Sequence, residues 1–324
     1  MQAVAIGKAI LRDTFRTYWT LVRTIVPVMA VTKIAVDFGL VEALAPALAP
    51  VMGALGLPAE LGVAWLMGAL VGFYAGVVPL FALVPVSELT SAQVTVYLGL
   101  LLVAHGLPIE QRVIQIAGPG MLATTALRLG GGFLYAWLLH LVFEATGWLS
   151  GPVAPYWIPA TSASDLGSFV FGAVQGLLWM FVILLALLAV MHLLEALGLV
   201  GRIAAAFAPA LRVCGIGPGA APVTIVGLLL GITFGSGLIK REAELGRVGA
   251  RDLFLACALM GFAHSLVEDT LIVLALGGDA VSLLLGRVAF AVVAVAVLAR
   301  LIDAMPDRSF YRYLFRRPAA AAGE

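Results

Sequence analysis

The residues of this sequence best suited to chemistry gather in the segment FAHSLVEDT, inside an apolar stretch near residue 264. On a helix, His264 and Glu268 are four residues apart and would share a face. Ser265 and Asp269 have the same spacing, and Thr270 follows them directly. Imidazole and carboxylate groups bind protons and divalent metals, and ionisable side chains within a membrane span usually face a cavity. The segment predicts a cation or polar-solute site, with His264, Glu268 and Asp269 as candidate metal ligands.

A second polar segment, AHGLPIEQ, interrupts an apolar stretch in the first half of the chain. It supplies His105 and Glu110, and we expect Pro108 to break its helix, because proline lacks an amide hydrogen and clashes with the preceding turn. Interrupted helices at matching positions in two halves indicate a mid-membrane binding site in transporters. Two Gly-rich stretches add candidate groups for ion or substrate binding at their turns: Tyr74 and Gly76 in one, and Thr233, Gly235, Ser236 and Gly237 in the other.

Most of these residues also have a purely structural interpretation. His264 and Glu268 could satisfy each other or cap a broken helix in the service of packing. Glycines spaced every four residues commonly form the ridge along which two helices pack. Arg128 and Arg287 begin the last span of each half, where we expect interfacial anchoring, and Asp279 is close enough in sequence to pair with Arg287.

Composition places these residues in a membrane protein. Charged residues make up 11 % and hydrophobic residues 62 % of the 324-residue chain, whereas about a quarter of a soluble domain is charged. Apolar stretches of roughly 20 residues recur, each long enough to cross a hydrocarbon core about 30 Å thick. The lipid bilayer is therefore an expected partner. A net charge of +1 leaves no large basic face for nucleic acid.

An internal repeat organises the chain. A single offset of 159 residues superimposes His105 on His264 without gaps, although the chain has only four histidines. The offset also aligns other residue pairs: Gly39 with Gly198, Pro50 with Pro209, Gly56 with Gly215, Gly72 with Gly231, Glu110 with Asp269, and Arg128 with Arg287. Coincidences among such residues are rare in so apolar a chain, so they predict two tandem copies of one membrane unit.

Each copy is predicted to contain four hydrophobic elements: 7–41, 61–85, 91–118 and 121–146, then 166–200, 218–239, 250–278 and 282–303. We assign the chain to four parts: residues 1–146 as the first membrane repeat, 147–165 as an extracytoplasmic linker, 166–303 as the second repeat, and 304–324 as a basic and aromatic cytoplasmic tail suited to the membrane surface. The stretches 42–57 and 202–214 are expected to lie along the interface. The predicted fold class is an all-α polytopic membrane protein.

Basic residues predict opposite orientations for the two repeats, because Lys and Arg are enriched in cytoplasmic loops. Both chain ends are assigned to the cytoplasm by the residues near them: Lys8, Arg12, Arg308 and Arg312. The loop 240–251 is basic, whereas its counterpart 81–92 is not. Basic residues flank both ends of 218–239, so it should enter and return as a broken hairpin, and 61–85 should do so from the other side. Each repeat then has about three transmembrane helices and one re-entrant hairpin, and an odd number of crossings inverts the second repeat.

The sequence APALRVCGIGPGAAPVTIVGLLLGITFGSGLI, with the following charged loop and the span that ends HSLVEDTLIVLALGG, resembles the Gate, or nucleoside recognition, family of bacterial membrane proteins. That family includes spore maturation proteins and is similar to gate regions of ferrous iron permeases and concentrative nucleoside transporters. The resemblance is clearest over 192–303 and fainter over 33–146. It implies permeation through paired hairpins in the bacterial inner membrane, without settling the substrate. This chain has no GTPase domain, so GTP-driven transport is not implied.

These observations favour a secondary-type transporter or permease that moves a small polar solute or a cation through a site between the repeats. A proton or sodium ion could be the coupling ion, and a bound divalent cation such as iron is a specific version. The rival interpretation is a non-transporting scaffold of the spore-maturation type, in which packing seals the polar residues. No metalloprotease, P-loop, nucleophile-elbow or dinucleotide motif is present, so we expect no enzyme activity. The sequence leaves open whether the chain forms a homo-oligomer.

Overall fold

A computed structural model describes residues 2–159, 166–232 and 248–316 of the chain. The regular elements within these ranges are all helices. Within these ranges, five helical segments are long and apolar enough to cross a membrane: Ser91–Ile116, Met121–Thr146, Leu166–Ala186, Ala250–Ala275 and Val281–Asp303. A sixth span results if Ile25–Asp37 and Leu40–Gly53, which meet at 91°, count as one. The protein is therefore an all-α polytopic membrane protein, as the sequence predicts.

The helices of the first half are α1 (Gln2–Asp37), α2 (Leu40–Gly53), α3 (Glu60–Val71), α4 (Phe73–Leu83), α5 (Ser91–Val103), α6 (Leu107–Ile116) and α7 (Met121–Thr146), with a 3₁₀ turn at Val86–Glu88. Those of the second half are α8 (Leu166–Ala196), α9 (Leu199–Val213), α10 (Ala221–Leu230), α12 (Ala250–Ala263), α13 (Glu268–Ala275) and α14 (Arg287–Asp303). A π-helical turn at Val281–Gly286 leads directly into α14. A short α15 (Asp307–Tyr313) follows. The bounds of α2 and α5 reappear 159 residues later, within one residue, in α9 and α12, and those of α7 reappear within two residues in Val281–Asp303, in support of the duplication.

The bends between elements also repeat at this offset. Gly39 and Gly198, which precede α2 and α9, both adopt left-handed backbone, with φ of 67° and 65°. Gly56 and Gly215, after the same helices, have φ of 67° and 70°. Only glycine enters this region at little steric cost, so each copy uses glycine to turn the chain out of its long first helix.

The hairpin expected over 61–85 is present as α3 and α4, which break at Gly72 (φ 148°) and pack closely on each other. Gly68 and Gly76 make this packing tight: a Cβ built on Gly68 would lie 3.0 Å from the Cα of Gly76. In the second half, α10 forms the first limb and ends at Gly231 (φ 97°). The second limb expected up to residue 239 lies outside the described residues.

The predicted spans 91–118 and 250–278, which carry His105 and His264, are both interrupted. Helix α5 ends at Val103 and α6 begins at Leu107, with Gly106 left-handed at φ 56°. The break therefore precedes Pro108, which lies in the first turn of α6, where a missing amide hydrogen costs nothing. Helix α12 ends at Ala263 and α13 begins at Glu268. His264 and Glu268 thus do not share the face of one continuous helix, contrary to the sequence-based expectation.

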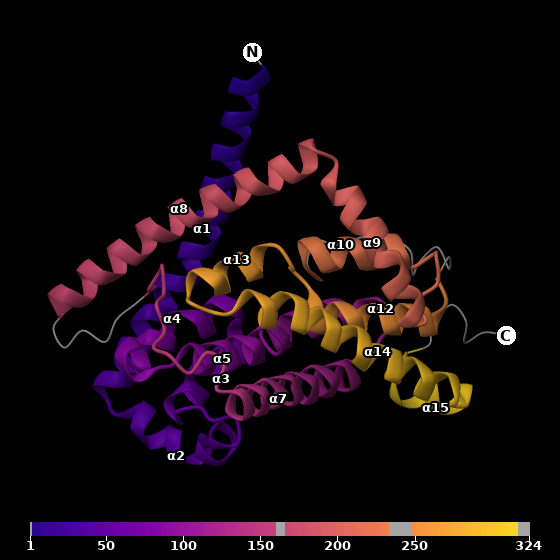
Figure 1. Ribbon diagram of the computed structural model, residues 1–324, viewed down its shortest axis with the longest axis horizontal. Helices are drawn as coiled ribbons and strands as arrows, with labels where there is room; N and C mark the ends of the chain where they lie inside the picture. Colours follow the sequence, from indigo (N-terminus) through magenta and orange to yellow (C-terminus); the bar gives the residue numbers. More distant parts are fainter. Residues whose placement is uncertain (1, 160–165, 233–247, 317–324) are drawn as a thin grey trace.

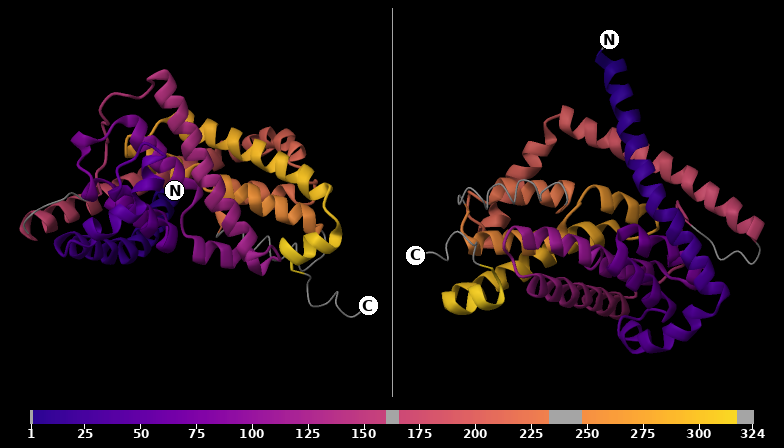
Figure 2. Two further views of the ribbon diagram at one scale, coloured as in Figure 1. Left: turned by 90° about the horizontal axis from the view of Figure 1, so that it is seen from below. Right: turned by 180° about the vertical axis from the view of Figure 1, so that it is seen from behind.

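Helices α5, α7, α12 and α14 form the packed centre of the molecule (Figure 1). The start of α7 lies at the end of the molecule where α14 leads into α15, because the Gly120 N–H donates to the carbonyl of Leu314, the residue after α15, at 2.7 Å. These two equivalent helices therefore run antiparallel, and Figure 2 shows the same arrangement from two other sides.

The starts of the two interrupted spans lie at opposite ends of Val281–Asp303. At the start of α12, Arg251 donates to the Met305 carbonyl at 2.8 Å, beyond the end of α14. At the start of α5, the Thr95 hydroxyl instead accepts from the Asp279 N–H at 3.1 Å, ahead of that segment. The two halves are therefore inverted relative to each other, as an odd number of crossings per repeat requires.

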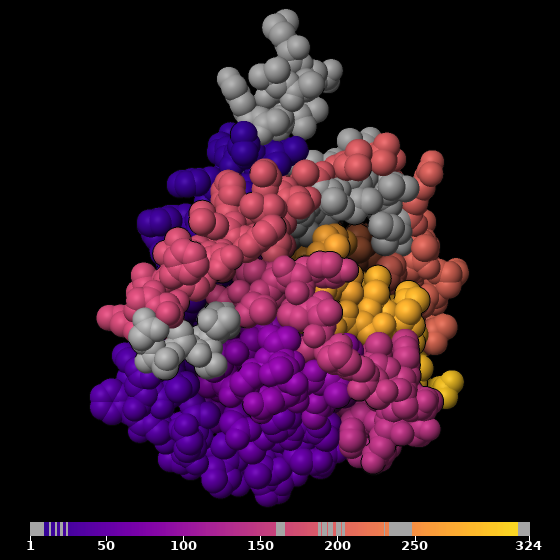
Figure 3. Space-filling model, turned by 60° about the vertical axis from the view of Figure 1, so that its left-hand side comes forward, coloured from indigo at the N-terminus to yellow at the C-terminus, as the bar shows by residue number. Residues whose placement is uncertain are grey.

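The outer helices and the tail pack against this centre. Helix α8 lies against α1, with Tyr18 and Phe181 in edge contact at 5.2 Å between ring centroids, and it crosses the face shown in Figure 3. The tail does not simply lie on a membrane surface. Phe310 and Phe315 are buried, and Phe310 packs edge-on against Phe254 of α12 at 6.0 Å.

Candidate functional site

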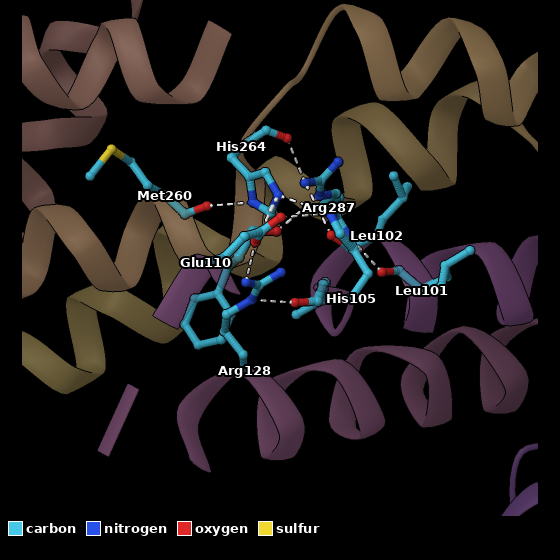
Figure 4. Close-up of polar contacts among 10 residues, drawn as sticks. Leu101, Leu102, His105, Glu110, Arg128, Met260, His264 and Arg287 are labelled. Atoms are coloured by element: carbon cyan, nitrogen blue, oxygen red, sulfur yellow. Dashed lines mark hydrogen bonds and ion pairs between the residues drawn. The ribbon is translucent and has the colours of Figure 1, made fainter. Parts of the chain in front are cut away.

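Two buried histidines meet where the two interrupted spans face each other. The Nε2 atoms of His105 and His264 are 3.2 Å apart, and their ring centroids are 4.9 Å apart (Figure 4). One ring follows α5 of the first half and the other follows α12 of the second. Because the residues are equivalent under the repeat, their contact lies at the symmetry point of the molecule.

Each imidazole is held in one tautomer by the helix that precedes it. The Nδ1 atom of His105 lies 2.8 Å from the Leu101 carbonyl, and that of His264 lies 2.9 Å from the Met260 carbonyl. A carbonyl oxygen only accepts hydrogen bonds, so each Nδ1 carries a hydrogen. In the neutral rings, both Nε2 atoms then present lone pairs toward each other. Two lone pairs at this distance repel unless a cation lies between them.

Two buried arginines cap the C-terminal ends of α5 and α12 at the breaks. Arg128 Nε donates to the Val103 carbonyl at 2.8 Å, and Arg287 Nε donates to the Phe262 carbonyl at 2.9 Å. These carbonyls are in the last turns of α5 and α12, where the helix itself offers no donor. The two side chains are 2 % and 0 % exposed. The expectation that Arg128 and Arg287 anchor at the interface is therefore wrong, because the breaks bury them.

The first half supplies a carboxylate that reaches both histidines. One oxygen of Glu110 accepts from Arg128, and the other lies 3.3 Å from His105 Nε2. The oxygen bound to Arg128 is also 3.6 Å from His264 Nε2. Glu110 comes from the first turn of α6, and the left-handed turn at Gly106 directs that helix back toward the histidines.

The second half supplies Asp269, which is buried with an exposure of 7 %. Its ligand oxygen and the ring nitrogens of His105 and His264 all lie within 4.8 Å of one another. Its Oδ2 atom has no hydrogen-bond partner among the described residues. We refer to His105, His264, Glu110 and Asp269 as the central cluster.

The remaining sequence-predicted residues lie around this cluster. Glu268 is half-buried and outside the group of candidate metal ligands found among the described residues. Thr270 is buried, and its hydroxyl has no partner within the described chain. Ser265 has left-handed backbone at φ 50°, and its Oγ is 2.6 Å from where a Cβ on Gly231 would lie. Thr233 and Ser236 lie outside the described residues.

The tip of the first hairpin borders the cluster. Phe73, the first residue after the break at Gly72, packs edge-on against the His105 ring at 5.4 Å between centroids. The hydroxyl of the adjacent Tyr74 is buried and has no hydrogen-bond partner among the described residues. The tip of the first hairpin, where the sequence places candidate binding groups, therefore lies beside His105 of the central cluster.

The hairpins are also bonded to the breaks through the backbone. The Gly106 N–H donates to the Gly68 carbonyl at 2.9 Å, and the Leu266 N–H donates to the Leu228 carbonyl at 2.9 Å. In both halves, an amide freed by the interrupted span binds a carbonyl in the last turn of the hairpin's first limb. A movement of α3 or α10 would therefore be transmitted directly to the breaks that follow α5 and α12.

Sequence reasoning missed the part that the arginines play. The offset of 159 pairs Arg128 with Arg287, and a charge duplicated inside two predicted spans was the available signal. The expected pairing of Asp279 with Arg287 is also absent from the described contacts. Asp279 instead accepts from the backbone and hydroxyl of Ser282, at 2.7 and 2.8 Å. Arg287 donates to the carbonyls of Phe262, His264 and Leu102.

The residues of this arrangement are of the types that can bind a cation. Two nitrogen lone pairs and two carboxylates converge in a buried volume, and two arginines carry the compensating positive charge. A proton between the histidines, or a metal ion held by the histidines and a carboxylate, would remove the repulsion between the lone pairs.

Comparison with known proteins supports the membrane assignment. The chain is 28 % identical over 293 residues to the uncharacterized membrane protein YvoD of Bacillus subtilis strain 168, a match that covers 88 % of this chain and 91 % of that protein. No protein-family model matches the chain. No solved structure matches it at a significant level.

Proposed function

We propose that this protein is a secondary-type transporter of the bacterial inner membrane, which moves a small polar solute or a cation through the central cluster. Its two inverted repeats would expose the cluster alternately to the two sides. The basic residues near both ends favour cytoplasmic termini. The resemblance to the Gate family implies permeation through paired hairpins, and the first hairpin, α3 and α4, adjoins the central cluster through Phe73.

The observation that carries the proposal is the contact between His105 and His264 at 3.2 Å, with Glu110 across both rings. A charged group at the centre of a membrane span costs about 2.5–3.5 kcal/mol on insertion scales. Apolar side chains of similar volume would seal the same helix breaks, and replacing a buried ion pair in this way is often neutral or stabilising. A purely structural role therefore does not require this set of ionisable groups.

The proposal is tested by solute flux into liposomes. Purified full-length protein is reconstituted, and uptake of divalent metals, nucleosides and amino acids is measured with and without a proton or sodium gradient. We expect at least one solute to be taken up, with loss of uptake in Glu110→Gln. The matched control is Glu144→Gln, because Glu144 lies 3.5 Å from His140 in an otherwise similar but exposed pair.

Solvent access separates a transporter from a scaffold. The test uses a Ser265→Cys variant. The native Cys214 and Cys257 are both buried, so they give little background reaction with thiol reagents. We expect a membrane-impermeant reagent to modify position 265 from at least one side. Absence of modification from both sides, together with absence of uptake for the whole solute panel, would overturn the proposal in favour of a sealed scaffold.

A further inference from the structure

We infer that the cation of the central cluster is a divalent transition-metal ion, bound by Nε2 of His105, Nε2 of His264 and a carboxylate oxygen of Asp269. This inference rests on the proposed function and gives it a substrate class. The three residues come from both halves of the chain, so the site exists only when the two repeats are docked. The set differs from that expected from sequence, because His105 takes the place of Glu268.

The spacing of the nitrogens fits a metal ion. Metal–nitrogen bonds of about 2.0–2.1 Å at a tetrahedral angle place two ligand nitrogens roughly 3.3 Å apart. The observed separation of the two Nε2 atoms is 3.2 Å. The carboxylate oxygen of Asp269 lies within 4.8 Å of both, so a small inward movement of one side chain completes a three-ligand site.

The surroundings of the histidines are those of oriented metal ligands. A ligating imidazole usually donates its second ring N–H to a carbonyl or carboxylate, which fixes the tautomer and the ring direction. His105 and His264 do this through Leu101 and Met260, each at four residues' distance along its own helix. Both Nε2 lone pairs are therefore set before an ion arrives.

Asp269 is available as the third ligand because the hydrogen bonds that Arg287 makes go to backbone carbonyls. Arg287 Nη2 donates to the His264 carbonyl at 2.7 Å and the Leu102 carbonyl at 3.4 Å, and its Nε binds the Phe262 carbonyl. No ion pair joins Asp269 and Arg287 among the described residues. Glu110, in contrast, is bound by Arg128 and contributes negative charge beside the histidines.

Ligand type and charge limit the identity and the affinity of the ion. Imidazole nitrogen favours zinc, iron, cobalt and similar ions, whereas magnesium and calcium prefer sites made of oxygen atoms. The two carboxylates are balanced by Arg128 and Arg287, so a bound dication leaves the cluster with excess positive charge. This excess weakens binding, as a site that releases its cargo requires.

Cobalt binding to full-length protein in detergent tests the inference. After chelator treatment, Co²⁺ is titrated and the visible absorption of tetrahedral cobalt is recorded, followed by competition with Zn²⁺ and Mg²⁺. We expect one ion per chain, displaced by Zn²⁺ and not by Mg²⁺. His105→Ala and His264→Ala should each weaken binding at least tenfold, whereas His140→Ala should leave it unchanged.

The paired carboxylate variants keep the test decisive where a histidine variant fails to fold. Asp269→Asn conserves shape and should weaken Co²⁺ binding at least tenfold, whereas Glu268→Gln should retain it. Absence of saturable binding by the native protein, or equal binding by Asp269→Asn, overturns the inference, and a proton shared between the histidines is then favoured. Gradient-driven uptake of a solute without Co²⁺ binding would reject the metal and keep the transporter. Co²⁺ binding without uptake of any solute would reject the transporter and keep the metal site.

Discussion

In the first half of the molecule a partly buried carboxylate forms an ion pair with its arginine, which we call the closed pair. The equivalent carboxylate and arginine of the second half form no ion pair, and we call them the open pair. Glu110 accepts from Arg128, but Asp269, one methylene shorter, forms no ion pair with Arg287. Arg287 turns instead to three backbone carbonyls. The duplicated frame is thus the same in both halves, and one methylene group decides which carboxylate is neutralised by an arginine and which remains free to bind.

The largest expected effect comes from removing the arginine of the closed pair. Arg128→Met leaves the partly buried Glu110 without its arginine and should lower the free energy of unfolding by about 3–5 kcal/mol. Arg287→Met removes a charged donor from carbonyls but strands no paired carboxylate, and should cost about 1.5–3 kcal/mol. Thermal unfolding in detergent measures both. Equal losses would contradict the comparison, and Glu110→Gln should partly rescue Arg128→Met only.

Exchanging the two carboxylates should move the open pair from one half to the other. Glu110→Asp shortens the side chain that binds Arg128, and losing a hydrogen bond to a charged group costs about 1.5–3 kcal/mol. Asp269→Glu should reach Arg287 and stabilise the fold while weakening Co²⁺ binding. Unfolding and cobalt titration are measured on the same preparations. If Asp269→Glu lowered both the free energy of unfolding and Co²⁺ binding, the missing ion pair with Arg287 would not be the reason why Asp269 is free to bind a metal.

Helices α3 and α10, the first limbs of the two predicted hairpins, should differ in their tolerance of an added methyl group. A Cβ on Gly68 would lie 3.0 Å from the Gly76 Cα and 2.4 Å from Leu101 Cδ1, so Gly68→Ala should cost about 1–3 kcal/mol. A Cβ on Gly227 would meet Met260, 2.0 Å from its Sδ, and a flexible methionine can move aside. Gly227→Ala should therefore unfold at a higher temperature than Gly68→Ala. The reverse order would indicate that side-chain movement at Met260 is blocked.

The smallest effect concerns the left-handed residue at each break. Ser265 at φ 50° carries a penalty of about 1–2 kcal/mol that glycine avoids. Glycine gains about 0.5–1 kcal/mol of freedom in the unfolded chain. Ser265→Gly should therefore stabilise by roughly 0.5–1 kcal/mol, while Gly106→Ser should destabilise, since its Cβ would lie 3.0 Å from Glu110 Oε1. Denaturation of both variants beside Ser265→Ala separates backbone strain from loss of the hydroxyl.

Much of the architecture could be predicted from the sequence because it depends on local hydrophobicity and on repetition. The bounds expected for α7, 121–146, agree with the structure, and the interrupted spans lie where polar residues enter apolar stretches. The carboxylate partner of His264 could not be predicted in the same way. Spacing along one helix favours Glu268, but the break after Ala263 removes that helix face, and Glu110 is 154 residues away in the chain.

The sequence by itself determined that the chain is a membrane protein of two matching halves, and which residue types could bind a cation. Insertion of apolar segments and the pairing of repeated residues are local or periodic properties, so they can be read without coordinates. Only the tertiary structure decided that His105 meets His264, that the arginines are buried, and that Asp269 has no ion-pair partner within the described part of the chain. Those outcomes depend on where the broken helices dock across the repeat, and a docked geometry arises from contacts between residues far apart in the chain.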